Sequence, residues 1–336
     1  MGDPALSVVI PTYQRRDSVV RLLRSLCTQT SEAADYEVIV SVDGSNDGTE
    51  RATAELATPY AKDTIWQPNA GRAAACNAGI RRARGEIVLL LDDDMEAEQD
   101  LVHAHIQAHE GAVPLGVVGA VPITLDPGAP PVAAFVAQKF NQHLATLAAP
   151  GYVFKPNDFY SGNFSIRRED LIRVGGYDEA FTIYGNEDVE LFLRLSAAGI
   201  RCVFSTRAAA RQHYTKGVRA LLRDNRAKGR TAVLLAGKHP DAVGQMKVAG
   251  YHRGSARWRM AREALLWASD RTAMIPRSVA TAAEWAERLW PGRPWLPYGL
   301  LVDYFFWLGV RDASRGTGSR VPAPSLTEPN DGAANA

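Results

Sequence analysis

Short runs of apolar residues alternate with helical patterns through the first two-thirds of the chain. Runs of strand length lie at residues 6–10, 37–42, 64–66, 87–91, 116–121, 159–166 and 201–205. Between them, apolar residues recur at helical spacing, most clearly at residues 18–26, 72–84, 98–109 and 187–198. A strand that is apolar on both faces belongs in a parallel sheet covered by helices. The pattern therefore predicts an α/β fold with a mainly parallel sheet flanked by helices.

Single residues predict where several of these strands and helices begin or end. We expect Pro11 to stop the first strand, and Asp17 or Ser18 to cap the helix that follows it. Gly85 is expected to end the alanine-rich helix before it, because glycine often stands just after a helix. Asn186 is expected to cap the helix that begins after it.

Only helical periodicity remains after residue 215. Val218, Leu221 and Leu222 share one face of a first helix, and a second helix near residues 257–268 mixes tryptophan with arginine. Further aromatic residues follow at Trp285, Trp290, Trp295, Tyr298, Tyr304, Phe305, Phe306 and Trp307. Such a mixture suits a membrane interface or a partner surface, but an aromatic stripe also packs on a core of its own. The pattern leaves both interpretations open.

Charge is distributed unevenly along the chain. The 336 residues carry a net charge of +1, with 22% charged and 46% hydrophobic residues, which is ordinary for a globular protein. Residues 207–320, however, hold 21 Lys or Arg against 8 Asp or Glu, a balance of +13, so the remainder carries −12. A basic region faces anionic lipid, nucleic acid or a phosphorylated substrate, or it is a solvated helical surface.

Cysteine usage and hydropathy indicate a cytoplasmic protein. Cys27, Cys76 and Cys202 lie far apart and show no metal-ligand spacing, which suits a reducing cytosol. The first residues lack the basic and apolar regions of a secretory signal. The longest apolar candidate, residues 296–310, contains Pro297 and falls short of the roughly 20 residues that span a bilayer. We expect a cytoplasmic protein, and peripheral contact of its basic helices with the inner membrane face stays open as one of the two interpretations of that region.

The candidate chemistry centres on Asp92, Asp93 and Asp94, which end the apolar run 87–91. Ligands bind just beyond the carboxyl ends of parallel strands. Three carboxylates there repel one another unless a cation joins them, and Mg²⁺ or Mn²⁺ takes oxygen ligands and bridges to phosphates. The alternative is a solvated acidic loop that starts the next helix. Asp43 ends the second strand on the same rim, which favours a nucleotide together with a metal ion.

A second acidic cluster lies at the start of the helix 187–198. Glu187, Asp188 and Glu190 follow Asn186 there. Acids at this position can simply offset the helix dipole, which is worth about 1 kcal/mol or less, and in isolation that interpretation is favoured. They can also supply a general base that the helix positions.

Taken together, these motifs resemble family 2 glycosyltransferases of the GT-A fold. The residues that carry the resemblance are Ser7-Val8-Val9-Ile10-Pro11-Thr12-Tyr13, Val42-Asp43-Gly44-Ser45-Asn46-Asp47-Gly48-Thr49, Asn77-Ala78-Gly79, the stretch from Gly85 to Asp94, Gly162-Asn163-Phe164-Ser165-Ile166, Gly175-Gly176-Tyr177-Asp178-Glu179 and Glu187-Asp188. Their order and spacing match over about residues 6–215.

The resemblance implies a division of the chain. Residues 1–215 would form the Rossmann-like GT-A catalytic domain, with the nucleotide-sugar part at about 1–121 and the acceptor part at about 122–215. Residues 216–318 would form a basic, tryptophan-rich helical extension. Residues 319–336 are small and polar and are expected to be disordered. The proline-rich stretch 122–131 is expected to be a loop at an edge or at the mouth of the site.

The resemblance also implies roles for residues that would bind the donor. Pro11, Thr12 and Tyr13 would line the nucleoside pocket, and Asp43 would bond the base, which is expected to be uracil. The remaining residues assigned to the donor are Arg72, Asn77, Asp92 and Asp93.

Further roles concern the metal, the base and the acceptor. Asp94 would be the direct ligand of Mn²⁺ or Mg²⁺, with Asp92 and His213 as the other candidate ligands, although a lone histidine is often an ordinary packed residue. Asp188 would be the catalytic base. The residues expected on the acceptor side are Gly162, Asn163, Tyr177 and Glu187.

The chain departs from the family pattern at a few positions. Val42 stands where members often have an acid, and Cys76 stands where many have arginine, which puts the diphosphate contacts in doubt and makes Arg72 a possible substitute. Processive synthases often show Gln-x-x-Arg-Trp, whereas Gly254 precedes Arg257-Trp258 here. This difference favours transfer of a single sugar over chain synthesis.

The resulting hypothesis is an inverting, metal-dependent glycosyltransferase. It would move one sugar from a nucleotide-diphosphate sugar to a glycan, lipid-linked or small-molecule hydroxyl acceptor, and nucleic acid is not an expected partner. One base and direct displacement invert the anomeric centre, whereas retention would want a second carboxylate as nucleophile. The alternatives are a nucleotide-sugar-binding or membrane-surface scaffold without turnover, and a sugar-phosphate nucleotidyltransferase. The latter would need a glycine- and arginine-rich loop where Pro11-Thr12-Tyr13-Gln14 stands.

Overall fold

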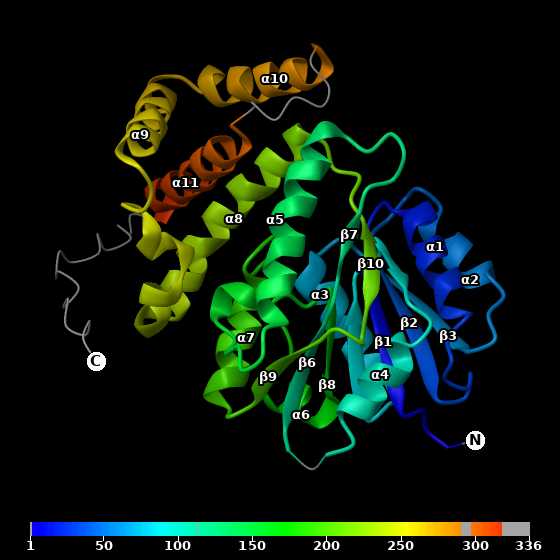
Figure 1. Ribbon diagram of the computed structural model, residues 1–336. Coiled ribbons are helices and arrows are strands. Elements are labelled where there is room, and N and C mark those ends of the chain that lie inside the picture. Colours follow the sequence, from blue (N-terminus) through cyan, green and yellow to red (C-terminus); the bar gives the residue numbers. More distant parts are fainter. Residues whose placement is uncertain (1, 112, 290–296, 318–336) are drawn as a thin grey trace.

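One mixed sheet forms the centre of the molecule in the computed structural model, which describes residues 2–111, 113–289 and 297–317. Its strand order is β3-β2-β1-β4-β8-β6-β9 (Figure 1). The bounds are β1 Leu6–Thr12, β2 Tyr36–Asp43, β3 Ala61–Gln67, β4 Ile87–Leu91, β6 Leu115–Gly119, β8 Asn163–Arg167 and β9 Arg201–Ser205. Every neighbouring pair is parallel except the two that involve β8. The predicted mainly parallel sheet is therefore confirmed, with β8 as a reversed strand.

Helices cover both faces of the sheet. Their bounds are α1 Arg16–Leu26, α2 Thr49–Glu55, α3 Arg72–Arg82, α4 Leu101–Ala108, α5 Pro131–Leu147, α6 Arg168–Arg173, α7 Glu187–Ala197, α8 Val218–Lys238, α9 Ala256–Arg271, α10 Met274–Leu289 and α11 Tyr298–Thr317. Side chains alternate along β1, so Val8 and Ile10 pack with Leu22 of α1 while Val9 packs with Ile80 of α3. Because both faces are buried, these strands appear in the sequence as unbroken apolar runs.

The first strand and the first helix differ from the expected boundaries. β1 runs through Pro11, which pairs with Ser41 of β2. β4 pairs only with Leu6–Val9, so on that side the missing N–H of proline breaks no ladder bond. The prediction that Asp17 or Ser18 caps the first helix is wrong, because α1 has already begun one residue before Asp17.

Gly85 does not end the helix before it, and Asn186 stands at the N-cap position of α7 without a capping bond from its side chain. Gly85 lies three residues beyond the end of α3, and its N–H donates to Ser7 Oγ at 2.8 Å, where a side chain would overlap the backbone of β1. Asn186 precedes α7, but its side chain makes no capping bond. Its amide instead donates to the Lys228 carbonyl (2.8 Å) and Thr231 Oγ1 (2.7 Å) of α8. Both residues join separate elements, which local sequence rules do not register.

The stretch expected to be a proline-rich loop contains a short strand and the start of a helix. β7 (Ile123–Thr124) joins β5 (Met95–Ala97) and β10 (Ala210–His213) in a second sheet of order β5-β10-β7. Strands this short carry no periodic signal. Pro131 is the first residue of α5. Proline suits this position because a backbone N–H there would have no partner within the helix, so the N–H that proline lacks is not missed.

The C-terminal helices pack around a core of their own. Tyr304, Phe306 and Trp307 of α11 are buried in it. α8 and α11 touch through Gly229 and Gly309, because a Cβ at either position would overlap the backbone of the facing helix. The aromatic stripe of α11 therefore packs internally. Trp290, Trp295 and the tail 319–336 lie outside the described residues.

None of the helices in the described ranges has an apolar stretch sufficient to cross a bilayer.

A buried histidine pair ties α4 to β8. Ser165 Oγ lies 2.7 Å from His105 Nδ1 and 2.8 Å from His109 Nε2, and His105 Nε2 lies 2.9 Å from Asn163 Oδ1. The pKa of each histidine is lowered to about 4, chiefly by burial, and repulsion by Arg167 contributes to the shift of His109. The fold therefore holds both imidazoles neutral.

This pair predicts acid sensitivity. An unfolded histidine takes up its proton near pH 6.5, whereas the folded pair does so only near pH 4. Stability conferred by the neutral rings is therefore present above about pH 6.5 and is lost as pH falls toward 4. Each histidine accounts for up to about 3 kcal/mol across that window. Urea unfolding of His109→Gln between pH 7 and pH 4 should show a shallower loss of stability than the wild type.

His103→Gln is the matched control, because His103 is exposed on the same helix. It should follow the wild-type pH dependence, and an unchanged slope in His109→Gln would contradict the account.

Candidate active site

The loop after β4 turns one of its three carboxylates inward. Asp93 is buried and accepts hydrogen bonds from Thr12 Oγ1 (2.7 Å) and Arg15 Nη1 (3.1 Å). Burial raises the pKa of Asp93 to about 7, although Arg15 opposes the rise. Arg15 Nη1 also reaches Asp94 Oδ2 at 3.0 Å. The middle acid therefore anchors the loop to β1, while the side chains of Asp92 and Asp94 stay partly exposed at the rim.

Arg72, the first residue of α3, joins two acids that are far apart in the sequence. Its Nη2 lies 2.8 Å from Asp92 Oδ1 and its Nη1 lies 3.2 Å from Asp188 Oδ1. Ser161 Oγ accepts from the same guanidinium at 3.2 Å, and the ring of Tyr177 lies beneath it at 5.7 Å. Burial disfavours the charge, but Asp92 and Asp188 outweigh it and hold the pKa of Arg72 well above its usual value. We call Arg72, Asp92, Ser161, Glu187 and Asp188 the Arg72 cluster.

Glu187 and Asp188 open α7 and face this cluster differently. Glu187 is buried, and its Oε2 accepts the Gly185 N–H at 2.8 Å. Burial and the neighbouring charge of Asp188 raise the pKa of Glu187, while Arg72, whose Nη1 lies 3.9 Å from its Oε1, opposes the rise. Asp188 is partly exposed and accepts a hydrogen bond from Ser161 as well as from Arg72. Asp188 is therefore the accessible acid of the two.

Asp43 holds the loop that leads into Arg72. Its carboxylate accepts from the side chains of Gln67 (2.8 Å) and Asn69 (3.2 Å) and from the backbone N–H groups of Ala70 and Gly71 (2.9 Å each). These four bonds occupy both oxygens of a buried side chain. Asp43 therefore acts first as a support for the start of α3.

Asn77 and Tyr177, two residues expected near the substrates, are hydrogen-bonded to each other. Asn77 Nδ2 donates to the Tyr177 carbonyl (2.9 Å) and to Glu179 Oε1 (2.8 Å), and its Oδ1 accepts the Tyr177 N–H (2.8 Å). Tyr177 is buried, and its hydroxyl bonds Ser161. Together they fix the floor of the Arg72 cluster.

The remaining sequence-predicted residues are divided between the surface and the interior. Pro11 and Thr12 are buried, whereas Tyr13 is 51% exposed at the end of β1. Gly162 lies against Asp92, and a Cβ there would approach Asp92 Oδ2 to 2.5 Å. Asn163 is fully buried, and its amide donates to the Ala120 and Ala208 carbonyls, so it supports the fold from inside.

His213 lies beside the acidic loop, but its ring faces other partners. Its backbone N–H donates to the Asp94 carbonyl at 3.0 Å. Its ring nitrogens lie 2.8 Å from Asp126 Oδ2 and 2.8 Å from Glu96 Oε2. Gln212, not His213, reaches the Asp94 carboxylate, at 3.3 Å.

Sequence reasoning missed three residues of this region: Arg15, Ser161 and Gln212. Ser161 and Gln212 are adjacent to residues that were singled out, and Arg15 is two residues beyond Tyr13, but polar residues beside a motif are too common to be selected by type alone. Arg15 carried the clearest signal, because a cation three residues after the end of β1 is close to the rim that holds the acids.

The acids at the rim supply part of a metal site. In the residues that the structure describes, no group of three or more His, Cys, Asp or Glu side chains forms a ready-made metal cluster. Asp92 and Asp94 nevertheless offer carboxylate oxygens, the donor type that Mg²⁺ and Mn²⁺ prefer. These two acids fit an ion whose other ligands come from a bound diphosphate.

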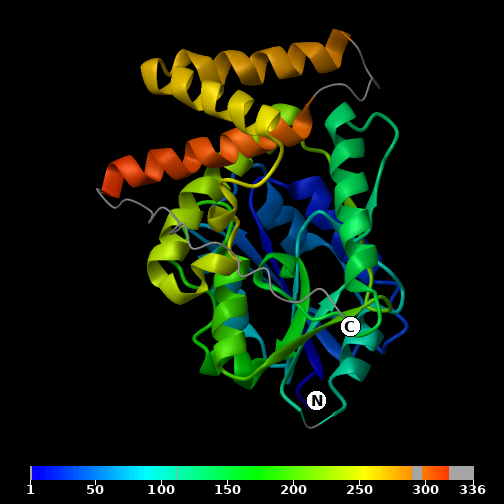
Figure 2. The same cartoon turned by 60° about the vertical axis from the view of Figure 1, so that its left-hand side comes forward.

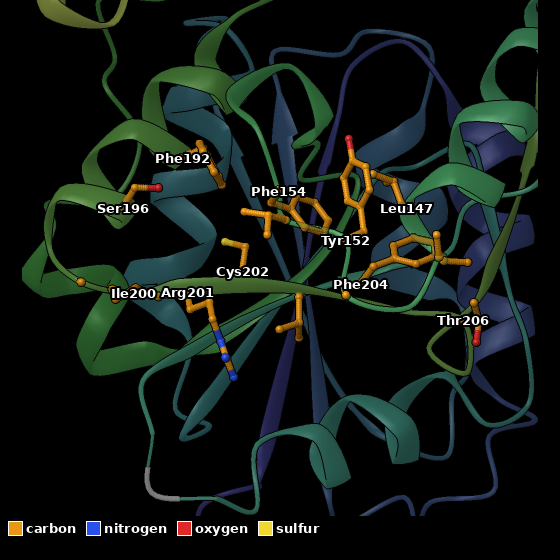
Figure 3. A pocket seen from close by; sticks show the side chains of 16 residues that line it. Leu147, Tyr152, Phe154, Phe192, Ser196, Ile200, Arg201, Cys202, Phe204 and Thr206 are labelled. Carbon is orange, nitrogen blue, oxygen red and sulfur yellow. The ribbon is translucent and has the colours of Figure 1, made fainter. Parts of the chain in front are cut away.

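A separate cavity of about 750 Å³ lies along the edge strand β9 (Figure 3). Tyr152, Phe154 and Phe204 lie close together in it, while Arg201 points away from them. None of the Arg72 cluster lines this cavity. Its volume therefore gives no information about the chemistry at the rim.

Comparison with protein families decides where this chain belongs. A family model described as glycosyl transferase family 2 matches residues 7–175, just over half of the chain. The chain belongs to glycosyl transferase family 2. A second model, described as the N-terminal domain of galactosyltransferase, matches residues 141–216. The family assignment made from the motifs is confirmed.

Curated relatives cover the same region. Validoxylamine A glucosyltransferase of Streptomyces hygroscopicus subsp. jinggangensis is 33% identical over 221 residues, covering 59% of this chain and 52% of that protein. Chondroitin synthase of Escherichia coli is 28% identical, covering 70% of this chain and 38% of that protein. This family 2 chain thus spans about half the length, or less, of these relatives.

Solved structures show the same fold at low identity. A mannosyltransferase of Pyrobaculum calidifontis, in complex with GDP-Man and Mn²⁺, aligns with a TM-score of 0.60 and 20% identity, over 95% of this chain and 89% of that chain. S. aureus TarS, residues 1–349, aligns with a TM-score of 0.51 and 14% identity, over 94% and 92%. These similarities confirm the GT-A fold class for this member of family 2.

The Arg72 cluster predicts a pH-dependent loss of stability when its cation is removed. In Arg72→Met, the three acids Asp92, Glu187 and Asp188 would repel one another without compensation, which costs about 3 kcal/mol or more at pH 8. The loss should be smaller at pH 5, because the raised pKa of Glu187 rises further without Arg72 and that acid is then neutral. Urea unfolding at the two pH values measures the difference.

Arg81→Met on the same helix is the control, since the Arg81 side chain is 67% exposed. It should change stability little at either pH. An equal loss for Arg72→Met at pH 5 and pH 8 would show that the cluster is not held by charge.

Proposed function

We propose that the chain is an inverting, metal-dependent glycosyltransferase that moves one sugar from a uridine diphosphate sugar to a hydroxyl acceptor. The observation that carries the proposal is the double contact of Arg72 with Asp92 and Asp188. It joins the acid beyond β4, where a donor diphosphate would lie, to an accessible carboxylate that could take a proton. Family membership supports the class of reaction.

In the proposed reaction, Asp188 takes the proton of the acceptor hydroxyl as the oxygen attacks the anomeric carbon. Arg72 and Ser161 donate hydrogen bonds to its carboxylate and so hold it in place beside the rim. The oxygen displaces the nucleotide diphosphate directly, so the configuration inverts. As negative charge develops on the leaving group, the guanidinium of Arg72 is close enough to the rim to stabilise it.

Asp94 and Asp92 would hold Mn²⁺ or Mg²⁺. When bound, this ion would neutralise the departing diphosphate. Arg15 now holds Asp94 and Arg72 holds Asp92, so ion and donor would take over contacts that the arginines make here. His213 could join as a ligand only after its ring leaves Glu96 or Asp126. The structural relative from Pyrobaculum calidifontis was crystallised with GDP-Man and Mn²⁺, which supports a divalent ion.

Donor and acceptor are proposed from weaker indications. The half-exposed ring of Tyr13 at the end of β1 provides a surface on which a nucleobase can stack. Structural relatives bind GDP-Man or UDP-GlcNAc, so uracil is one of two bases in that group. The name of the relative validoxylamine A glucosyltransferase supports a glucosyl donor and a discrete acceptor rather than a growing polymer.

The base assignment predicts a split between binding and turnover. Asp188→Asn should retain nucleotide binding but lose transfer by about 10²-fold or more, because no carboxylate then takes the proton. Turnover of a panel of nucleotide sugars, with isothermal calorimetry of UDP binding alongside, measures both effects.

Asp241→Asn is the control, because Asp241 is exposed and lies outside the Arg72 cluster. Retention of more than a tenth of the wild-type turnover by Asp188→Asn would refute the assignment. Nucleotide binding without any turnover of the wild type, on any donor and acceptor tried, would favour a binding scaffold.

The metal assignment predicts a change in nucleotide affinity that needs no turnover. Addition of Mn²⁺ to chelator-treated wild type should tighten UDP binding about tenfold or more, a gain of about 1.4 kcal/mol. Asp94→Ala should bind UDP as the metal-free wild type does and gain nothing from Mn²⁺. The Asp241→Ala control should keep the full gain. Equal affinity of the wild type with and without Mn²⁺ would exclude metal dependence of donor binding.

A further inference from the structure

One stripe of α9 faces away from the protein and is apolar in its middle. Arg257, Met260, Ala264, Trp267 and Arg271 follow one another at spacings of three and four residues, so they share one side of the helix. All five are exposed, Met260 at 71% and Trp267 at 59%. The opposite side carries the buried residues of the helix and packs on α11. An apolar stripe on the outer side contributes nothing to the core.

The next helix repeats the arrangement. Met274, Ser278, Ala282, Trp285 and Leu289 of α10 lie at the same kind of spacing, and all are exposed, Trp285 at 56%. The buried residues of α10 lie on the other side, where the helix packs on α8. These five residues and the five of α9 form what we call the outward stripes.

Each exposed tryptophan of the outward stripes lies beneath an arginine. The guanidinium of Arg271 is 3.2 Å from the ring centroid of Trp267, and that of Arg288 is 5.9 Å from Trp285. An arginine over a tryptophan ring places a cation and a flat apolar surface at the same point. Such pairs suit the boundary between water and lipid, where Trp and Arg both gather.

The acids near the outward stripes already lie beside arginines. Asp270 bonds Arg311 and Arg315, Glu284 bonds Arg219 and Arg288, and Glu263 lies beside Arg262 and Arg311.

In contrast, Arg253, Arg257 and Arg277 make no ion pair with any residue that the structure describes, and all three are exposed. The outward stripes are therefore bordered by unpaired cations, which complement a negatively charged surface.

The outward stripes lie at one end of the molecule. Figures 1 and 2 agree that α9 and α10 form the outermost layer, on the outer side of α8 and α11 and far from the N-terminus. No described helix is apolar enough to cross a bilayer, so contact with lipid would be made by helices lying on the surface.

We propose that the outward stripes of α9 and α10 dock the protein on an anionic lipid bilayer. Met260, Trp267, Met274, Trp285 and Leu289 enter the headgroup region, and the bordering arginines pair with anionic headgroups. Each arginine near such a surface strengthens partitioning about fivefold. This docking surface is separate from the Arg72 cluster. The docking proposal can therefore be tested independently of the proposed glycosyl transfer.

The test is flotation of the full chain with vesicles of phosphatidylcholine alone or with 30% phosphatidylglycerol, about an ordinary anionic fraction. The wild type should float with the anionic vesicles, remain behind with the neutral ones, and be released by high salt. Trp267→Ser/Trp285→Ser should reduce partitioning about tenfold or more through lost apolar contact. Arg257→Gln/Arg277→Gln should reduce it about 25-fold on the anionic vesicles.

Matched controls are Trp66→Ser, at a half-exposed tryptophan of β3, and Arg24→Gln, at an exposed arginine of α1. Both should float as the wild type does, and circular dichroism melts should show all variants folded. Failure of the wild type to float, or equal flotation of the double variants, would overturn the proposal. So would a concentration-dependent dimer, seen by light scattering, that the tryptophan variant abolishes, because the stripes would then bind a second copy.

Discussion

A single guanidinium, that of Arg72, compensates three carboxylates that the fold gathers from distant parts of the chain. Asp92, Glu187 and Asp188 would repel one another without it, and burial would make that repulsion stronger. The rest of the rim serves to place this cation. Asp43 fixes the backbone just before it, and Tyr177 lies beneath it. Asp43 was expected to bond a nucleobase, and in this structure it supports the backbone that positions Arg72.

The same cluster links stability to chemistry. Arg72 holds acids of the rim in place, and in the proposed function the same cation would stabilise the negative charge of the donor diphosphate. The buried acid Asp93 contributes differently. It anchors the acidic loop to β1 through Thr12 and Arg15, so of three consecutive aspartates only the outer two remain at the rim. Adjacent residues of one motif thus have different roles: Asp93 supports the loop, and Asp92 and Asp94 are the proposed metal ligands.

The C-terminal helices show a comparable division between interior and surface. α11 uses its aromatic residues for packing, and the glycine contact of α8 with α11 brings the two backbones together. α9 and α10 then cover this core and keep methionine and tryptophan on the outside, bordered by unpaired arginines. Packing therefore accounts for the aromatic residues of α11, whereas those of α9 and α10 belong to the proposed docking surface.

The sequence alone determined the fold class and the family, because unbroken apolar strands separated by helical patterns, with acids at the strand ends, leave few other arrangements. It also placed Asp43 and the Asp92–Asp94 stretch on one rim, since carboxyl ends of parallel strands share an edge, whereas a role for Asp188 came only from the family resemblance. Only the tertiary structure decided what each residue does there. These roles depend on contacts between residues that are far apart in the sequence, in two cases by more than a hundred positions. They include the inward turn of Asp93, the burial of Asn163, the partners of His213 and the contacts of Arg72. The local sequence pattern does not predict such contacts. All polar residues near a strand end have the same pattern in the sequence, and only the folded sheet brings their partners beside them.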